Sequence, residues 1–192
     1  MLSEDRKIKT RQQLKEVLAL ECACYPLTPR HWLPYLFQIS EKAILRRHTV
    51  LLRKAEYYTN NGKRLRAGFY TARLMKLQNR HAMHIPLNTC AKGLRIYHIA
   101  PIIMNTNASI GENCRMMPMA KVVGDDRYDY SPTVGDNVTL GIDCTLVGGI
   151  TIADGITVGA GAVVTKSFTE PGITIAGVPA KKRHGNRAEG SL

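Results

Sequence analysis

The 192-residue chain lacks any long run of apolar residues. Its first 13 residues are strongly polar, and no apolar stretch approaches the roughly 18 residues that cross a membrane. The start also lacks the apolar core of a secretory signal peptide. We therefore expect a cytoplasmic protein without a membrane span.

The five cysteines form no recognisable metal or disulfide pattern. Cys22 and Cys24 make a lone CxC, Cys90 stands alone, and Cys114 and Cys144 fall within a repeat described below. None of these spacings matches a zinc site or a disulfide framework. We expect reduced thiols, most of them buried, and no bound metal.

Acidic residues are scarce in the first half of the chain. Residues 1–84 hold 17 Lys/Arg against 6 Asp/Glu, whereas residues 85–192 hold 10 against 9, so the first half carries almost all of the net charge of +12. A basic half of this kind is compatible with nucleic acid, anionic lipid or acidic partners. It is equally compatible with ordinary solvated helix faces, and both interpretations stay open.

Helix signals are confined to this basic half. Thr10 and Gln13 fit a capping box at the start of a helix that runs to about Cys24. Ser40 is a second candidate cap, for a helix that ends at residues 60–62 (Asn-Asn-Gly). A third helical stretch is expected over about residues 63–82.

The second half shows neither the period of a helix nor the strict alternation of an ordinary strand. Its apolar residues recur every six positions, and a second apolar series follows four places later in each hexad. Such hexads predict coils of three short strands that place one aliphatic side chain per strand into a triangular core and stack on one another. A β-sandwich with short strands is the alternative, but it requires a period of two. The first series is Val134, Leu140, Leu146, Ile152, Val158 and Val164, and the second is Val138, Cys144, Ile150, Ile156, Ala162 and Phe168.

The same register extends backwards from the middle of the chain. Met104, Ile110, Met116 and Val122 are six residues apart, and the register fails at Asp126. The polar stretch 124–132 is therefore expected to leave the coil as a loop, and loops on repeat scaffolds often shape binding sites. Corners are expected at small or polar residues, namely Asp136, Asn137, Asp143, Asp154 and Gly155.

Five segments carry a resemblance to a known family. They read GLRIYH (93–98), MNTNASIGENC (104–114), PTVGDNVTLG (132–141), VGAGAVVTK (158–166) and AGVPAKK (176–182). Together they resemble the serine acetyltransferases, and most of all the short members found among bacterial surface-polysaccharide genes. The likeness covers about residues 40–183 and implies a left-handed parallel β-helix. We expect a basic α-helical region over 1–84, the β-helix over 85–183 and a tail over 184–192.

The resemblance implies a homotrimer with active sites between neighbouring β-helices, in which acetyl-CoA donates its acetyl group directly to an acceptor. His98 matches the family's general base. The backbone N–H of Gly141 is a candidate oxyanion donor by family position. Extending the hexads back from Met104 would instead place His98 at an inward position, where its side chain would only fill space in the core.

The coenzyme site is expected at the carboxyl end, where small residues let a thin pantetheine arm approach the backbone. The lysines there suit the phosphates of the nucleotide, although a merely basic tail is the alternative. The residues that match family contacts are Gly141, Gly159, Ala160, Thr165, Lys166, Ala176, Gly177, Lys181 and Lys182.

The chain departs from the larger family members at two places. His84 stands where they carry an Asp that pairs with the catalytic His, and no His occurs near Ser131, where they carry a second one. Both departures leave the acceptor open. The loop offers Asp125, Asp126, Arg127 and Tyr128 as candidate acceptor contacts.

The resemblance therefore implies O-acetylation of serine or a related small hydroxyl acceptor. O- or N-acetylation of a sugar or polysaccharide precursor is the nearest alternative. A zinc-dependent carbonic anhydrase of the same fold requires three His ligands, and only His98 lies within the coils. A non-enzymatic protein that binds nucleic acid or membrane through its basic half is a further alternative, but aromatic-rich nucleic-acid motifs are absent. Pairing of two trimers is left open.

Overall fold

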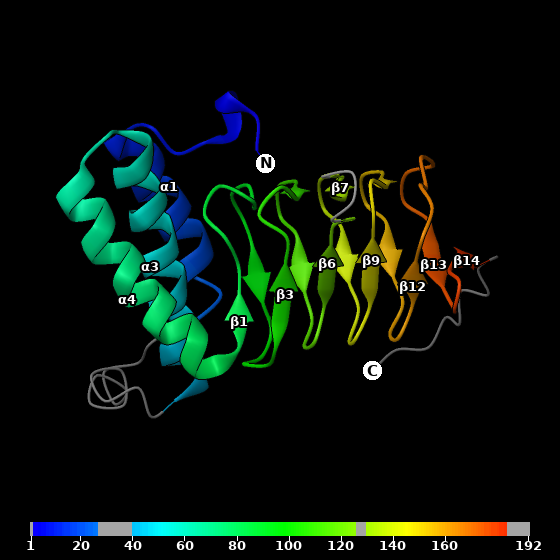
Figure 1. Cartoon of the computed structure of the whole chain (residues 1–192). Coiled ribbons are helices and arrows are strands. Elements are labelled where there is room, and N and C mark those ends of the chain that lie inside the picture. The colour runs from blue at the N-terminus through cyan, green and yellow to red at the C-terminus, as the bar shows by residue number, and fades with distance from the viewer. Residues whose placement is uncertain (1, 27–39, 126–129, 184–192) are drawn as a thin grey trace.

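A computed structural model describes residues 2–26, 40–125 and 130–183 of the chain. Three long helices lie against one end of a stack of β-coils, and the strands run in parallel ranks from β1 to β13 (Figure 1). No helix in the described ranges is long and apolar enough to cross a membrane.

The long helices begin and end close to where the sequence places them. They are α1 (Arg11–Cys22), α3 (Glu41–Asn60) and α4 (Arg64–His81), with a short 3-10 helix η1 (Glu4–Arg6) before them. The Thr10 hydroxyl accepts the N–H of Gln13, and the Gln13 side chain accepts the N–H of Thr10, so the predicted capping box is confirmed. Ser40 caps α3 by accepting the N–H of Ala43.

The strands form three sheets that make the faces of a triangular prism. Sheet A contains five strands in the order β1-β3-β6-β9-β12, sheet B contains β10-β7-β4, and sheet C contains six in the order β14-β13-β11-β8-β5-β2. From β3 to β12 successive strands visit A, B and C in turn, and all strand pairings are parallel except β13 with β14. The fold is thus the predicted left-handed parallel β-helix. The strands are β1 Met83–His84, β2 Arg95–Ile96, β3 Ile102–Met104, β4 Ser109–Ile110, β5 Arg115–Met116, β6 Lys121–Val123, β7 Thr133–Val134, β8 Thr139–Leu140, β9 Thr145–Val147, β10 Thr151–Ile152, β11 Thr157–Val158, β12 Val163–Val164, β13 Thr174–Ala176 and β14 Lys181–Lys182.

The hexad residues fill the prism as predicted. All six members of the first series are at most 2 % exposed, and the second series is buried except for Phe168, which is partly buried. Stacking buries a continuous aliphatic column that no single coil could bury alone. Three of the predicted corner residues, Asn137, Asp143 and Gly155, have φ between 56° and 70°, the left-handed conformation that tight corners require.

Two interruptions of the hexads separate this chain from a regular prism. Ile96 pairs with Met116, 20 residues on, whereas Met104 pairs with Val122, 18 residues on, so two extra residues lie between Ile96 and Met104. The second interruption follows β6, where Ile110 pairs with Val134 24 residues later. It includes the predicted polar loop, whose ends meet in an antiparallel bridge between Asp125 and Tyr130.

A buried ionic cluster joins the helices to the first coil. Arg53 of α3 is 1 % exposed and donates to the carboxylates of Glu21 and Glu56 and to the carbonyls of Cys90 and Ala91. Glu21 in turn accepts the backbone N–H groups of residues 93 and 94. Because every charge is paired and hydrogen-bonded, the cluster fixes the helical layer on the coil end without an orphaned ion.

Candidate active site

One edge of the prism collects most of the predicted site residues. The backbone N–H groups of Tyr97, Met117, Gly141 and Gly159 donate to the carbonyl of the next coil at 2.8–3.2 Å, so these residues stack in register where the chain passes from sheet C to sheet A. We call this corner the site edge. It comprises residues 97–101, 117–120, 141–144 and 159–162, together with residues 176–180, which end β13 and lie against the last of these segments.

His98 lies on the site edge, at the end that faces the helices. Its side chain is 63 % exposed, so the alternative that it fills the core is wrong. The reason is the two-residue insertion after Ile96, which places Ile96 inward and releases His98 from the hexad register. An exposed imidazole at a corner is available to a ligand.

Glu41, the first residue of α3, supplies a carboxylate to this histidine. Its Oε2 lies 3.3 Å from Nδ1 of His98, and its Oε1 accepts the backbone N–H of Ile99 at 2.8 Å. Both side chains are partly exposed. No local pattern in the sequence indicates this contact, because 57 residues separate Glu41 and His98.

The opposite end of the site edge carries the predicted coenzyme residues. Val158 and Ile175 are paired, so Gly159 and Ala160 lie beside Ala176 and Gly177. A Cβ on Gly159 would lie 2.9 Å from the Cβ of Ala176, which shows how closely the two backbones approach. The edge therefore ends in a narrow, small-residue cradle.

Of the predicted lysines, Lys181 lies nearest to this cradle because it pairs with Ala176 across β13 and β14. Lys182 is bonded to both carboxylate oxygens of Glu170 at 2.6 Å, which leaves it less available to a phosphate. Thr165 and Lys166 follow β12, at the corner between sheets A and B, and Lys166 lies over the ring of Phe168. The structure therefore places these two away from the site edge of their own chain.

The backbone of Gly141 does not offer a free donor. Its N–H donates to the carbonyl of Val158 at 2.9 Å as part of the ladder between coils. An oxyanion donor must point at the ligand, so we do not propose Gly141 in that role. It remains a candidate coenzyme contact by position, since it lies between His98 and the cradle.

Exposed apolar side chains line the middle and far end of the site edge. Met119 is 45 % exposed, Ile142 52 % and Val178 73 %. Large apolar groups gathered along one edge mark a surface that a ligand or another chain covers.

The predicted acceptor loop lies on a different corner. Asp125 and Tyr130 close its neck between β6 and β7, where the chain passes from sheet A to sheet B. Asp126, Arg127 and Tyr128 lie outside the described residues. Within one chain, therefore, the loop neck and His98 stand on different edges of the prism.

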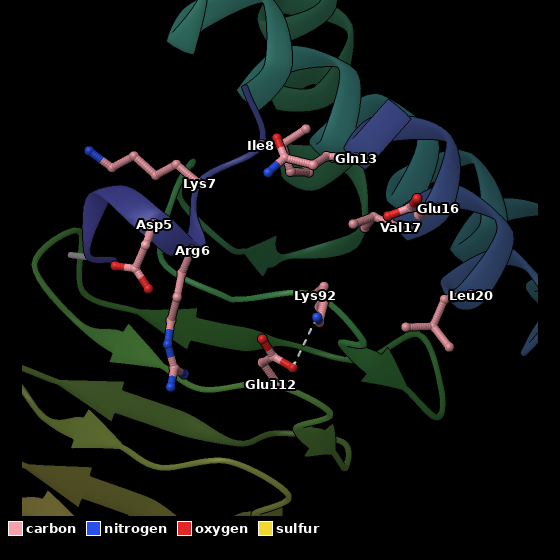
Figure 2. A pocket seen from close by; sticks show the side chains of 10 residues that line it. All are labelled: Asp5, Arg6, Lys7, Ile8, Gln13, Glu16, Val17, Leu20, Lys92 and Glu112. Atoms are coloured by element: carbon pink, nitrogen blue, oxygen red, sulfur yellow. Dashed lines mark ion pairs between the residues drawn. The ribbon is translucent and has the colours of Figure 1, made fainter. Parts of the chain in front are cut away.

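A hollow of about 400 Å³ lies between η1, α1 and the first coils (Figure 2). It contains none of the predicted site residues. Its charges are of both signs, with Lys92 paired to Glu112 at 3.4 Å, while Arg6 reaches Asp136 at 2.6 Å. The Asp136 contact lowers the pKa of that carboxyl. These pairs tie the N-terminal segment to the coils. The lining is Asp5, Arg6, Lys7, Ile8, Gln13, Glu16, Val17, Leu20, Lys92 and Glu112.

Comparison with known proteins supports the assignment of the fold. Residues 133–166 match the family model described as the hexapeptide repeat of succinyl-transferase. The match confirms the hexapeptide repeat over that segment. No curated protein matches this sequence.

Solved structures extend the likeness to nearly the whole chain. Serine acetyltransferase from Neisseria gonorrhoeae, in complex with serine, is 22% identical with a TM-score of 0.62 over 88% of this chain and 69% of that one. The Brucella abortus enzyme in complex with coenzyme A is 19% identical, with a TM-score of 0.61 over 90% and 68%. The soybean apoenzyme is 22% identical, with a TM-score of 0.65 over 88% and 69%. At these identities the likeness establishes a shared fold, helices included.

Proposed function

We propose that this protein transfers the acetyl group of acetyl-CoA to a hydroxyl of serine or a related small acceptor, with His98 as general base. The observation that carries the proposal is the site edge itself. An exposed imidazole held against a carboxylate stands at one end, and a small-residue cradle with Lys181 stands at the other. Fold relatives solved with coenzyme A and with serine support this choice of ligands.

The Glu41 carboxylate assigns the two ring nitrogens different tasks. In the active tautomer Nδ1 is protonated and its N–H donates a hydrogen bond to Glu41, so Nε2 carries a free lone pair. Nε2 takes the proton of the acceptor hydroxyl as its oxygen attacks the thioester carbonyl. The C–S bond then breaks, the imidazolium returns the proton to the leaving thiolate, and the products are the acetyl ester and free coenzyme A.

The distance along the edge suits an elongated donor. Sheet C runs from β2, next to His98, to β13, next to the cradle, and four strand spacings separate them. At about 4.8 Å per spacing this is roughly 19 Å. A pantetheine arm laid along the edge would carry the thioester from the cradle to His98 and would cover exposed Ile142.

The acceptor contacts are completed, in this proposal, by a neighbouring chain of a homotrimer. The loop neck at Asp125 and the pair Thr165 and Lys166 stand on other edges than His98. Bringing them to the site requires a second copy whose corner packs along the site edge, and the exposed apolar residues there favour such packing. Sedimentation at equilibrium is expected to give three times the chain mass.

The test is release of coenzyme A thiol from acetyl-CoA in the presence of a panel of acceptors. Serine-dependent release is expected, and His98→Ala should lower it at least about a hundredfold. His81→Ala is the matched control, since His81 is also a partly exposed histidine but lies at the end of α4, outside the site edge. Near-normal turnover by His98→Ala, or no thiol release with any acceptor, would refute the proposal.

The alternative acceptor is a sugar hydroxyl or amine of a polysaccharide precursor. It keeps the same donor site and base, because His84 and the missing loop histidine change only the acceptor side. Turnover with a nucleotide-linked amino sugar in the same panel, but not with serine, would establish it instead.

A further inference from the structure

Helix α4 contains no acidic residue. No Asp or Glu occurs anywhere between Glu56 and Glu112, a stretch that includes all of α4. Helix α4 nevertheless has a clear inner side, because Leu74, Leu77 and Gln78 are buried. Its other side is turned to solvent at the end of the molecule opposite β14 (Figure 1).

Apolar and cationic side chains share this outer side. Leu65 is 93 % exposed and Phe69 53 % exposed, and they are four residues apart, so they lie on the same helix face. Lys76, Arg73 and Arg80 follow on that face and are exposed. With Arg47 of α3 they surround a hollow of about 470 Å³. We call the set Arg47, Leu65, Phe69, Arg73, Lys76 and Arg80 the cationic face.

The cations of this face have no carboxylate partner among the described residues. The guanidinium of Arg73 lies 5.3 Å from the centre of the Phe69 ring, which orders it without neutralising it. Uncompensated cations gathered around one hollow create a positive potential that favours an anionic ligand.

We propose that the cationic face docks the protein on an anionic phospholipid surface. Headgroup phosphates would occupy the hollow among the four cations, and Leu65 and Phe69 would enter the interfacial region beneath them. Docking through the cationic face does not require the acetyltransferase activity. The site edge lies on the coils, so a docked molecule keeps it accessible.

Two other occupants fit the face less well. A second copy of this chain would bring the same cations against each other, which is repulsive. A nucleic acid would satisfy the cations but would give Leu65, which is 93 % exposed, no apolar environment. A bilayer interface satisfies both kinds of side chain at once.

The experiment is sedimentation of the full chain with vesicles of phosphatidylcholine containing one third phosphatidylglycerol, and with vesicles of phosphatidylcholine alone. Binding is expected only to the anionic vesicles. Each Lys or Arg near such a surface contributes roughly fivefold in affinity, so Arg73→Gln with Lys76→Gln should weaken binding about 25-fold. The matched control is Arg11→Gln with Lys15→Gln on α1, which removes the same charge from exposed positions outside the cationic face.

A second variant separates lipid from other anions. Leu65→Ser should also weaken vesicle binding several-fold without affecting folding, because the side chain contacts almost nothing in the free protein. Unchanged vesicle binding by Leu65→Ser, equal loss in the Arg11/Lys15 control, or tighter binding to duplex nucleic acid than to vesicles would overturn the proposal. Loss of vesicle binding in millimolar inorganic phosphate would also overturn it, because the hollow would then bind the free ion. Pairing of trimers that is disrupted in the Arg73/Lys76 variant would overturn it as well, because the face would then be an interface between copies of the chain.

Discussion

The contact between Glu41 and His98 makes the sharpest prediction about mechanism. In Glu41→Gln the side chain keeps its shape, and its carbonyl oxygen can still accept the N–H of Ile99. The amide NH₂ then faces Nδ1 of His98 where a carboxylate oxygen stood. Because an NH₂ group cannot accept a proton, the variant favours the wrong tautomer, with Nε2 protonated and unable to act as a base.

The size of the effect follows from the geometry. A hydrogen bond to a charged group contributes about 1.5–3 kcal/mol. The distance of 3.3 Å is long for such a bond, and the side chains of His98 and Glu41 are 63 % and 44 % exposed, so solvent screens the interaction. We therefore take a value just below this range, about 1.4 kcal/mol, which corresponds to roughly a tenfold loss of kcat.

The assay is steady-state thiol release, with kcat and KM for acetyl-CoA determined separately. We expect kcat to fall about tenfold and KM to stay unchanged, because Glu41 lies beside His98, at the end of the site edge opposite the cradle. Lys42→Gln, the neighbouring exposed residue of α3, serves as control and should retain full kcat. A Glu41→Gln kcat within twofold of the wild type, or a loss of the same size in Lys42→Gln, would contradict the assigned role.

Three further predictions concern the scaffold and the donor site. Arg53→Met leaves Glu21 and Glu56 buried without a cation and should lower the free energy of unfolding by about 3–5 kcal/mol in urea, whereas Lys54→Met should change it little. His48 is fully buried and burial lowers its pKa from 6.5 to about 4, so between pH 6.5 and 4 the unfolded state binds the proton first and the protein loses up to about 3 kcal/mol of stability as pH falls. His48→Leu should remove that slope from the pH dependence of the urea midpoint, and an unchanged slope would disprove the assignment. Lys181→Gln should raise KM for acetyl-CoA roughly tenfold with kcat retained, because it removes a cation beside the cradle but leaves His98 in place.

The prism could be predicted from the sequence because its physics is periodic. Each hexad places one aliphatic residue inward, so the local pattern alone predicts that Leu140, Leu146 and Ile152 are core residues. The caps at Thr10 and Ser40 were predictable for a similar reason, since capping joins residues only three apart.

Features that depend on insertions or on distant partners could not be predicted in this way. Two extra residues after Ile96 shift His98 from an inward to an exposed position, and a simple backward count from Met104 passes over them. The Glu41 contact depends on how α3 sits against the first coil, which is fixed by the buried bonds of Arg53 rather than by any local pattern.

The approach of the Glu41 carboxylate to His98 depends on the buried bonds of Arg53. Arg53 binds the carbonyls of Cys90 and Ala91 in the first coil and the Glu21 carboxylate of α1, and this fixes α3 against the coil that carries His98. Twelve residues before Arg53, the same helix begins with Glu41. A helix is stiff over this length, so anchoring it at Arg53 sets the place of its first residue. The resemblance predicts an Asp partner at the position of His84, whereas in this chain a helix held by a buried ion cluster brings a Glu carboxylate to the imidazole.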